Sequence, residues 1–184
     1  IPTDKWQKLF QKKIYFGHQS VGYNIIDGIN DLMKKHPEIK LNIVETNSAS
    51  DFKVGLLAHS RVGKNEDPKS KISEFVNFIN SGIGEKAEAA ALKFCYVDIG
   101  PETIVGGLFS GYNSSIEQLK NKYPDMTIIH FTNPLTRRQT GPKAWIKKII
   151  GRPISGIEDN IKRNEFNELL IKKYDGKEPI FDIA

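Results

Sequence analysis

Residues 13–24 read KIYFGHQSVGYN, and the hydrophobic pattern changes its period within them. The first five residues are rich in strand-forming side chains and predict a strand. From Val21 onward apolar residues recur every three or four positions until Pro37, which predicts a helix. A second apolar run at 40–45 predicts the next strand. Strand, helix and strand in this order predict a right-handed, parallel βαβ unit.

The same alternation continues to the end of the chain. The other predicted strands are 92–97, 126–131 and 179–183, and the other predicted helices are 4–11, 68–81, 112–123 and 157–174. Residues 46–67 are predicted to form loops with one helical turn, and 85–91 a short helix or the approach to a strand. This alternation predicts an α/β fold, a three-layer α/β/α sandwich with a flavodoxin-like, five-stranded parallel sheet. Ligands bind such sheets at the carboxyl ends of the strands.

Composition limits the class of protein further. The 184 residues are 39% hydrophobic and 27% charged, which excludes collagen-like and wholly disordered chains and predicts a single domain over 1–184. The single cysteine, Cys95, excludes an internal disulfide framework and a multi-cysteine zinc site. No phosphate-binding or dinucleotide-binding glycine motif is present, and no His and carboxylate cluster has metal-ligand spacing. We therefore expect no cofactor and no metal.

Charge and targeting signals are weak. The net charge of +5 is modest, so we expect no nucleic-acid partner. No apolar run approaches the length of a membrane helix, and no signal-peptide pattern precedes the first strand. The sequence begins at Ile1 rather than Met. This start favours a processed, exported protein over a cytoplasmic one, and we expect a monomer.

Ser20 is the first candidate for chemistry. It lies where the first predicted strand turns into the first predicted helix, so its hydroxyl is expected at the sheet edge. Its backbone N–H would belong to a helix N-terminus, where the dipole favours an oxyanion. The alternative is structural, because serine is a common N-cap at this position.

The stretch His18-Gln19-Ser20 between strand and helix resembles block I of the SGNH/GDSL hydrolases, which usually reads Gly-Asp-Ser. The resemblance extends over most of the chain through its strand order and loop placement. It implies that Ser20 is the nucleophile of an ester hydrolase. For block II it implies that the Gly63 N–H helps to line the oxyanion hole, with Asn65 as a neighbouring polar donor.

Two blocks depart from the family pattern. Block III supplies an asparagine donor after the third strand, but this chain has Asp98 there, and an ionised Asp98 would repel an oxyanion. Block V supplies Asp-x-x-His with the general base, and the sequence ends at Ala184 where that block is expected. We therefore expect a truncated form of a longer protein, or else a family member that has lost catalysis.

Several other polar residues lie at the same predicted edge. His36 is expected at the surface and His130 in the core, whereas His18 and His59 could face the site. The candidate substrate-binding residues are His18, Gln19, His59, Asp98, Thr132, Asn133 and Thr136. The turn that follows the fourth predicted strand could equally be a capped turn set by Pro134.

Segment 137–152 carries six basic residues and no acidic ones, a charge of +6. Trp145, Ile146, Ile149 and Ile150 form an apolar stripe within it. The segment is interpreted as a lid-like insertion or as an amphipathic helix in weak contact with an anionic surface. The alternative is a surface helix that docks its stripe on the domain.

These observations lead to two hypotheses about function. The first is a serine esterase of SGNH type that acts on an O-acyl ester of a small molecule or glycan. The second is a catalytically inactive SGNH-like module that binds an anionic ligand or glycan. An Asp-x-x-His segment following Ala184 in the natural protein would favour the first hypothesis.

Overall fold

The computed structural model describes residues 3–53, 55–137, 140, 142 and 156–184. Its centre is a parallel six-stranded sheet in the order β2-β3-β1-β4-β5-β6. The strands are β1 (Lys13–His18), β2 (Ile43–Glu45), β3 (Leu56–Arg61), β4 (Ala89–Leu92), β5 (Thr127–Phe131) and β6 (Ile180–Phe181). The parallel α/β fold is thus confirmed, with one strand more than predicted.

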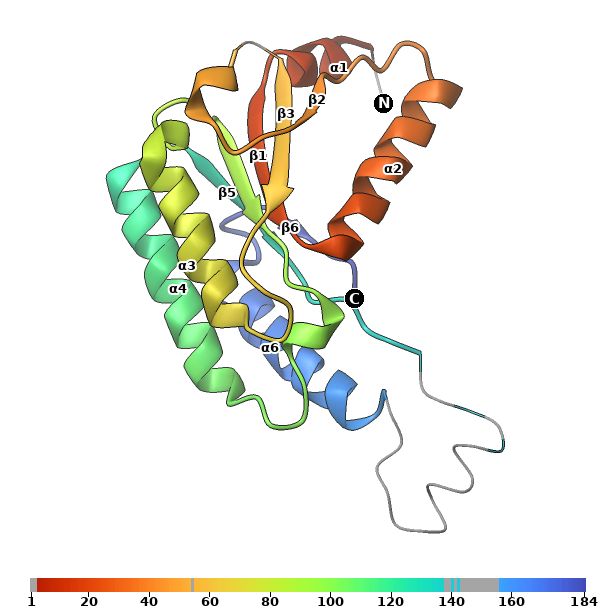
Figure 1. Ribbon diagram of the computed structural model, residues 1–184, viewed down its shortest axis with the longest axis vertical. Helices are drawn as coiled ribbons and strands as arrows, with labels where there is room; N and C mark the ends of the chain where they lie inside the picture. Colours follow the sequence, from red (N-terminus) through yellow and green to blue (C-terminus); the bar gives the residue numbers. More distant parts are fainter. Residues whose placement is uncertain (1–2, 54, 138–139, 141, 143–155) are drawn as a thin grey trace.

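Helices form a layer on each face of this sheet (Figure 1). They are α1 (Thr3–Phe10), α2 (Ser20–Lys35), α3 (Pro68–Phe78), α4 (Val105–Lys122) and α6 (Glu158–Tyr174), with short turns η1 (Ala49–Asp51), η2 (Ile79–Ile83) and η3 (Tyr96–Asp98). Helices α3, α4 and α6 cover one face and share the main core with it. Helix α2 packs on the other face, where Ile26 meets Phe16 and Ala91. None of the helices in the described ranges is both long and apolar enough to cross a bilayer.

The additional strand is β3, in a region predicted to be loop. Its sequence, Leu56–Arg61, ends in His-Ser-Arg, so it has no long apolar run. It nevertheless lies between β1 and β2 and is mostly buried. Without the edge strand β2, the order β3-β1-β4-β5-β6 is the flavodoxin-like 2-1-3-4-5 order, whose topological switch point lies between β1 and β4.

The third predicted strand, 92–97, was placed wrongly. The strand is Ala89–Leu92, and residues 96–98 form the turn η3. Alanine favours helices, but in β4 its small side chain leaves room for the large rings of the neighbouring strands. Phe16 of β1 and Phe131 of β5 stack with ring centroids 5.3 Å apart on either side of β4, and Ala91 belongs to the same cluster as both rings.

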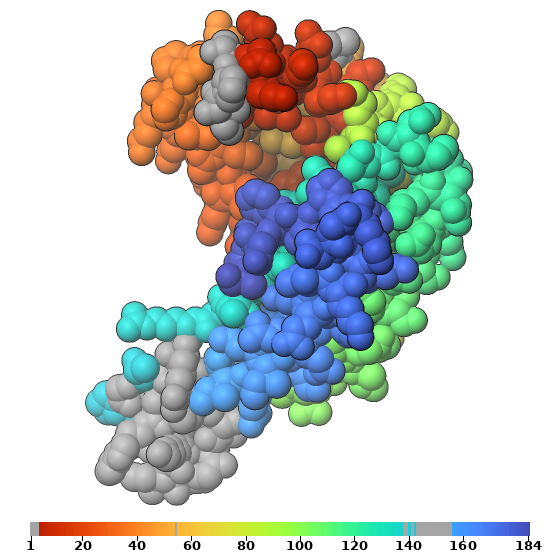
Figure 2. Space-filling view, turned by 180° about the vertical axis from the view of Figure 1, so that it is seen from behind, coloured from red at the N-terminus to blue at the C-terminus, as the bar shows by residue number. Residues whose placement is uncertain are grey.

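Seen from behind, the surface is hollowed between the orange residues, which include α2, and the cyan segment after β5 (Figure 2). The basic segment 137–152, predicted as a lid, lies almost entirely outside the described residues.

Candidate active site

Ser20 is the first residue of α2 and directly follows the central part of the sheet. The N-cap is Gln19, whose side chain makes no capping hydrogen bond. Ser20 is exposed, and no hydrogen bond holds its hydroxyl among the described residues. The N-cap interpretation of Ser20 is therefore wrong. An uncommitted hydroxyl stands at the N-terminus of a 16-residue helix, at the carboxyl end of β1.

Gln19 connects this helix start to the loop after β3. Its Nε2 donates to the carbonyl oxygens of Val62 and Gly63, at 2.9 and 2.7 Å. The expected oxyanion role of Gly63 does not fit the structure, because its N–H donates to the carboxylate of Glu74. Gly63 has a φ of +56°, and a Cβ there would lie 2.4 Å from the Lys71 backbone nitrogen. The turn that requires glycine also directs its amide toward α3.

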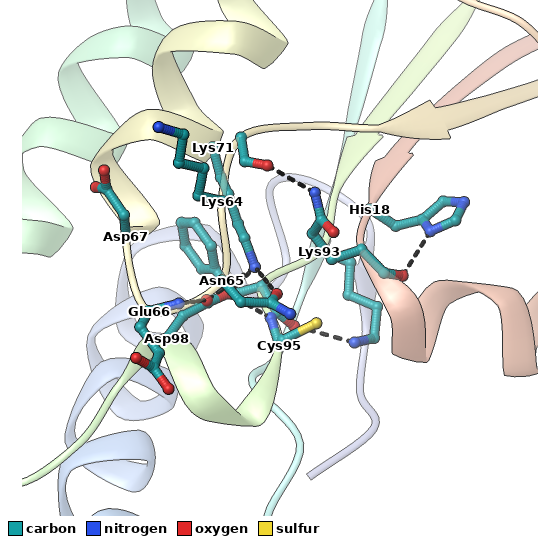
Figure 3. A network of polar contacts seen from close by, with 12 residues as sticks. His18, Lys64, Asn65, Glu66, Asp67, Lys71, Lys93, Cys95 and Asp98 are labelled. Atoms are coloured by element: carbon teal, nitrogen blue, oxygen red, sulfur yellow. Dashed lines mark hydrogen bonds and ion pairs between the residues drawn. The ribbon is translucent and has the colours of Figure 1, made fainter.

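Asp98 belongs to a closed network and is not a substrate contact. Its side chain is fully buried, and its carboxylate oxygens lie 2.6 and 2.8 Å from Lys71 Nζ. They also accept the backbone N–H groups of Glu66, at 3.0 Å, and Cys95, at 2.6 Å. Figure 3 shows these groups converging on Lys71 and Asp98. The expected repulsion between Asp98 and an oxyanion is thus offset by an ammonium group.

Asn65 takes part in the same network. Its Oδ1 accepts a third hydrogen bond from Lys71 Nζ, at 3.0 Å, while the residue itself stays exposed. Lys71 was missed by sequence reasoning. Its spacing held a signal, since Lys71 lies one helical turn before the buried Phe75 and so falls on the inner face of α3.

Lys93 is a second buried lysine that sequence reasoning missed. It directly follows β4, and its backbone N–H donates to the Gly17 carbonyl of β1 at 2.9 Å. Only 1% of its surface is exposed, and its Nζ donates to the Phe94 carbonyl at 3.0 Å. Within the described ranges no carboxylate lies within ion-pair distance of this amine. Burial lowers the pKa of Lys93, whereas the nearby Cys95 and Asp98 act to raise it and the charge of Lys71 acts to lower it.

His18 and His59 form a hydrogen-bonded pair beneath α2. The Gln19 carbonyl can only accept, so His18 Nδ1 carries the proton of their 2.7 Å bond. His18 Nε2 then accepts from His59 Nδ1–H at 3.0 Å. Burial lowers the pKa of His18 to about 4 and also lowers the pKa of His59. Both side chains are nearly inaccessible to solvent. His18, at 0% exposure, therefore supports the start of α2 and does not touch a substrate.

Tyr23 of α2 covers this histidine pair. Its ring meets the rings of His18 and His59 edge-on, with centroids 4.9 and 5.9 Å apart. Its hydroxyl donates to the carboxylate of Glu45 and accepts from Arg61 Nε at 3.3 Å. The pair is thus fixed from β1, β3 and α2 together.

The polar residues after β5 divide between structure and surface. Thr132 is buried and bonds to Asp182 and to the Ile183 N–H, both at 2.8 Å. Asn133 is buried too; it pairs with Asn167 through its backbone, and its Oδ1 has no partner among the described residues. Thr136 is half-buried and lines a cavity of about 410 Å³. Of the three predicted substrate contacts in this turn, only Thr136 reaches an open surface.

This cavity lies next to η3 and the start of α6. Tyr96, 41% exposed, lies on one side with the buried Arg163 guanidinium 5.8 Å from its ring centroid. Glu66, Arg137 and Asp159 add charged groups to the lining. Arg163 is itself held by Thr136 Oγ1 at 2.7 Å and the Ile99 carbonyl at 3.2 Å. Among the described residues, no group of three or more His, Cys, Asp or Glu side chains is placed to hold a metal ion.

No protein-family model and no curated protein matches this sequence. Among solved structures, the chain is similar to a protein from Streptococcus pneumonia that is provisionally described as a platelet activating factor. The two share 12% identity at a TM-score of 0.49, over 98% of this chain and 71% of the other. A likeness of this degree identifies no activity, so the chemistry of this chain rests on its own side chains.

Proposed function

We propose that this protein hydrolyses O-acyl esters through an acyl intermediate on Ser20. The observation that carries the proposal is the place of the Ser20 hydroxyl. It is exposed, is not used as a cap, and stands at a helix N-terminus beside the topological switch point of the sheet. A nucleophile needs this combination of access and a nearby set of N–H donors.

The reaction would proceed in two halves. The Ser20 oxygen attacks the ester carbonyl carbon, and the first-turn N–H groups of Ser20 and Val21 stabilise the oxyanion, since these amides have no acceptor within the helix. The bond to the leaving alcohol then breaks, and the alcohol departs with the proton that the Ser20 hydroxyl gave up. In the second half water attacks the acyl carbon and releases the acid, and Ser20 regains its proton.

The cavity of about 410 Å³, whose lining does not include Ser20, offers groups that suit a sugar. An exposed aromatic ring such as Tyr96 can stack on a sugar ring, and the charged groups of Glu66, Asp159 and Arg137 can bind hydroxyl groups. The substrate class we propose is therefore an O-acylated glycan or a smaller O-acyl ester.

The alternative function is non-catalytic binding of an anionic ligand or glycan at the same edge. The use of the Gly63 amide by Glu74 favours it, because this removes one expected oxyanion donor. The two functions differ in whether Ser20 reacts, which can be measured directly.

The test is reaction with a fluorophosphonate, followed by mass spectrometry to locate the adduct. We expect an adduct on Ser20, and we expect Ser20→Ala to lower kcat/KM for p-nitrophenyl acetate by about a thousand-fold. Ser50→Ala, which changes an exposed serine after β2, is the matched control. A folded protein that gives no Ser20 adduct, yet still binds acylated sugars, would favour the binding module.

A further inference from the structure

Ser20 and Lys93 lie on the two sides of the topological switch point. From β1 the chain leaves through Ser20 and α2 toward β2 and β3 on one side, whereas β4 pairs with β1 on the other. Leu92 is level with Gly17 in the register, and the Lys93 N–H donates to the Gly17 carbonyl. Lys93 is therefore level with His18, two residues before Ser20.

The Lys93 side chain lies on the same face of the sheet as α2. Side chains alternate along a strand, so Lys93 shares the face of Ala91, which packs with Phe16 and with Ile26 of α2. The charge of Lys93 also lowers the pKa of His18, which lies beneath the start of α2. Figure 3 shows the Lys93 side chain running from the end of β4 toward the Phe94 carbonyl, with His18 on the α2 side.

The two buried lysines are in opposite chemical situations. Lys71 is matched by a carboxylate, whereas Lys93 donates to a neutral carbonyl and has no carboxylate in contact among the described residues. A buried amine without a counter-charge favours its neutral form. A neutral amine that donates one N–H still has a lone pair, and a lone pair can accept a proton.

The histidines are poorer candidates for the same task. Both ring nitrogens of His18 and of His130 are engaged, His130 with Tyr112 and Glu178. His59 is buried beneath Tyr23 on the β3 side of β1, away from the switch point. Lys93 is the buried base that stands at the switch point itself.

We propose that Lys93 is the general base that accepts the proton of the Ser20 hydroxyl. This inference rests on the proposed esterase function. As the Ser20 oxygen bonds to the ester carbonyl carbon, its proton passes to Lys93 Nζ, and the ammonium group returns that proton to the leaving alcohol as the C–O bond breaks. In deacylation Lys93 takes a proton from the attacking water and gives it to the Ser20 oxygen.

The experiment measures the rate of fluorophosphonate labelling at Ser20 against pH in the full chain. We expect the wild-type rate to rise with pH through one titration below the ordinary lysine value of 10.5. Lys93→Met should lower the rate at pH 8 by about 100-fold or more and abolish that titration. Lys40→Met, which removes an exposed lysine after α2, should change neither.

Two further variants keep the outcome decisive. Lys93→Arg keeps a positive charge but cannot accept a proton, so it should lose labelling of Ser20 as Lys93→Met does. If Lys93→Met folds poorly, the Arg variant still tests the proposal. Wild-type labelling rates in Lys93→Arg, or loss of the titration in His59→Gln instead, would overturn the proposal. Failure of the wild-type protein to label at all would overturn the esterase function itself, which is a different result.

Discussion

Two polar clusters, each built around a buried lysine, lie side by side at the carboxyl edge of the sheet, and they differ in how completely their polar groups are paired. The Lys71 cluster consists of Asn65, Glu66, Lys71, Cys95 and Asp98; the Lys93 cluster consists of His18, Gln19, Gly22, His59 and Lys93. In the first, the ammonium has three acceptor oxygens and the carboxylate has two further N–H donors. In the second, the amine of Lys93 has one neutral acceptor among the described residues.

This difference indicates that the first cluster holds the fold, and on the proposed function the second one serves chemistry. A buried charge that is fully paired resists removal of either partner, because the other is left uncompensated. A buried amine without a counter-charge costs stability, and such a cost persists where the group has another task. The first cluster fixes the loop after β3 and η3, and the second carries the helix start that presents Ser20.

The largest effect is expected in the Lys71 cluster. Asp98→Asn keeps the shape of the side chain but leaves the ammonium of Lys71 unpaired, and we expect the free energy of unfolding to fall by about 3–5 kcal/mol. Urea denaturation measures this change. Asp31→Asn, which breaks an exposed pair with Lys34, is the control and should leave stability almost unchanged.

A double variant sharpens this result. Lys71→Met/Asp98→Asn removes both charges, so it should be more stable than Asp98→Asn alone. If the double variant were the less stable of the two, hydrogen bonding by Lys71 rather than charge pairing would hold this cluster together.

The next effect concerns pH and the Lys93 cluster. The folded-state pKa of His18 lies at about 4, below its ordinary 6.5, so between these values the unfolded chain binds a proton that the folded chain does not. Stability should therefore fall as the pH drops through this window, by up to about 3 kcal/mol. His18→Gln should reduce the dependence, measured as the free energy of unfolding at several pH values, and His59 and His130, whose pKa values are also lowered, should supply the remainder. His36→Gln, which removes an exposed imidazole, is the control.

The sequence alone was sufficient for the parts of this edge that are local. The change of period at residues 13–24 placed β1, Ser20 and α2, because strand and helix periodicity are properties of neighbouring residues. Strand β3 could not be recognised in the same way, since its burial depends on β1 and β2 on either side. The Ala-rich β4 likewise owes its conformation to partner strands.

The residues of the candidate site also divide into those with a local sequence signal and those that depend on distant partners. The place of Ser20 was predictable, but the pairing of Lys71 with Asp98 joins residues 27 positions apart and has no local signal. The direction of the Gly63 amide depends on a positive φ, which glycine permits without requiring it. The role of Lys93 was not recognised because the residue was predicted to lie within a strand, whereas it is the first residue after β4.

A smaller effect tests how tightly His18 supports the helix start. A Cβ at Gly22 would lie 2.1 Å from the His18 ring, so Gly22→Ala must displace that ring or α2. We expect a loss of about 1–3 kcal/mol and slower labelling of Ser20. Gly28→Ala in the same helix meets nothing within 4 Å and should instead stabilise the protein by about 0.5–1 kcal/mol. Equal stability changes in the two variants, measured by thermal denaturation, would contradict the supporting role of His18.

The smallest effect has the opposite sign and bears most directly on the comparison. Lys93→Met removes a buried amine that lacks a counter-charge, so we expect the free energy of unfolding at pH 7 to rise by about 1 kcal/mol while esterase activity falls. The folded-state pKa of Lys93 is lowered, so between that value and the ordinary 10.5 the unfolded chain binds the extra proton and wild-type stability rises with pH. Lys93→Met should lack this component of the rise, as the difference between the two urea-denaturation series will measure. A large loss of stability in Lys93→Met would mean that both lysines hold the fold, and the distinction between the two clusters would disappear.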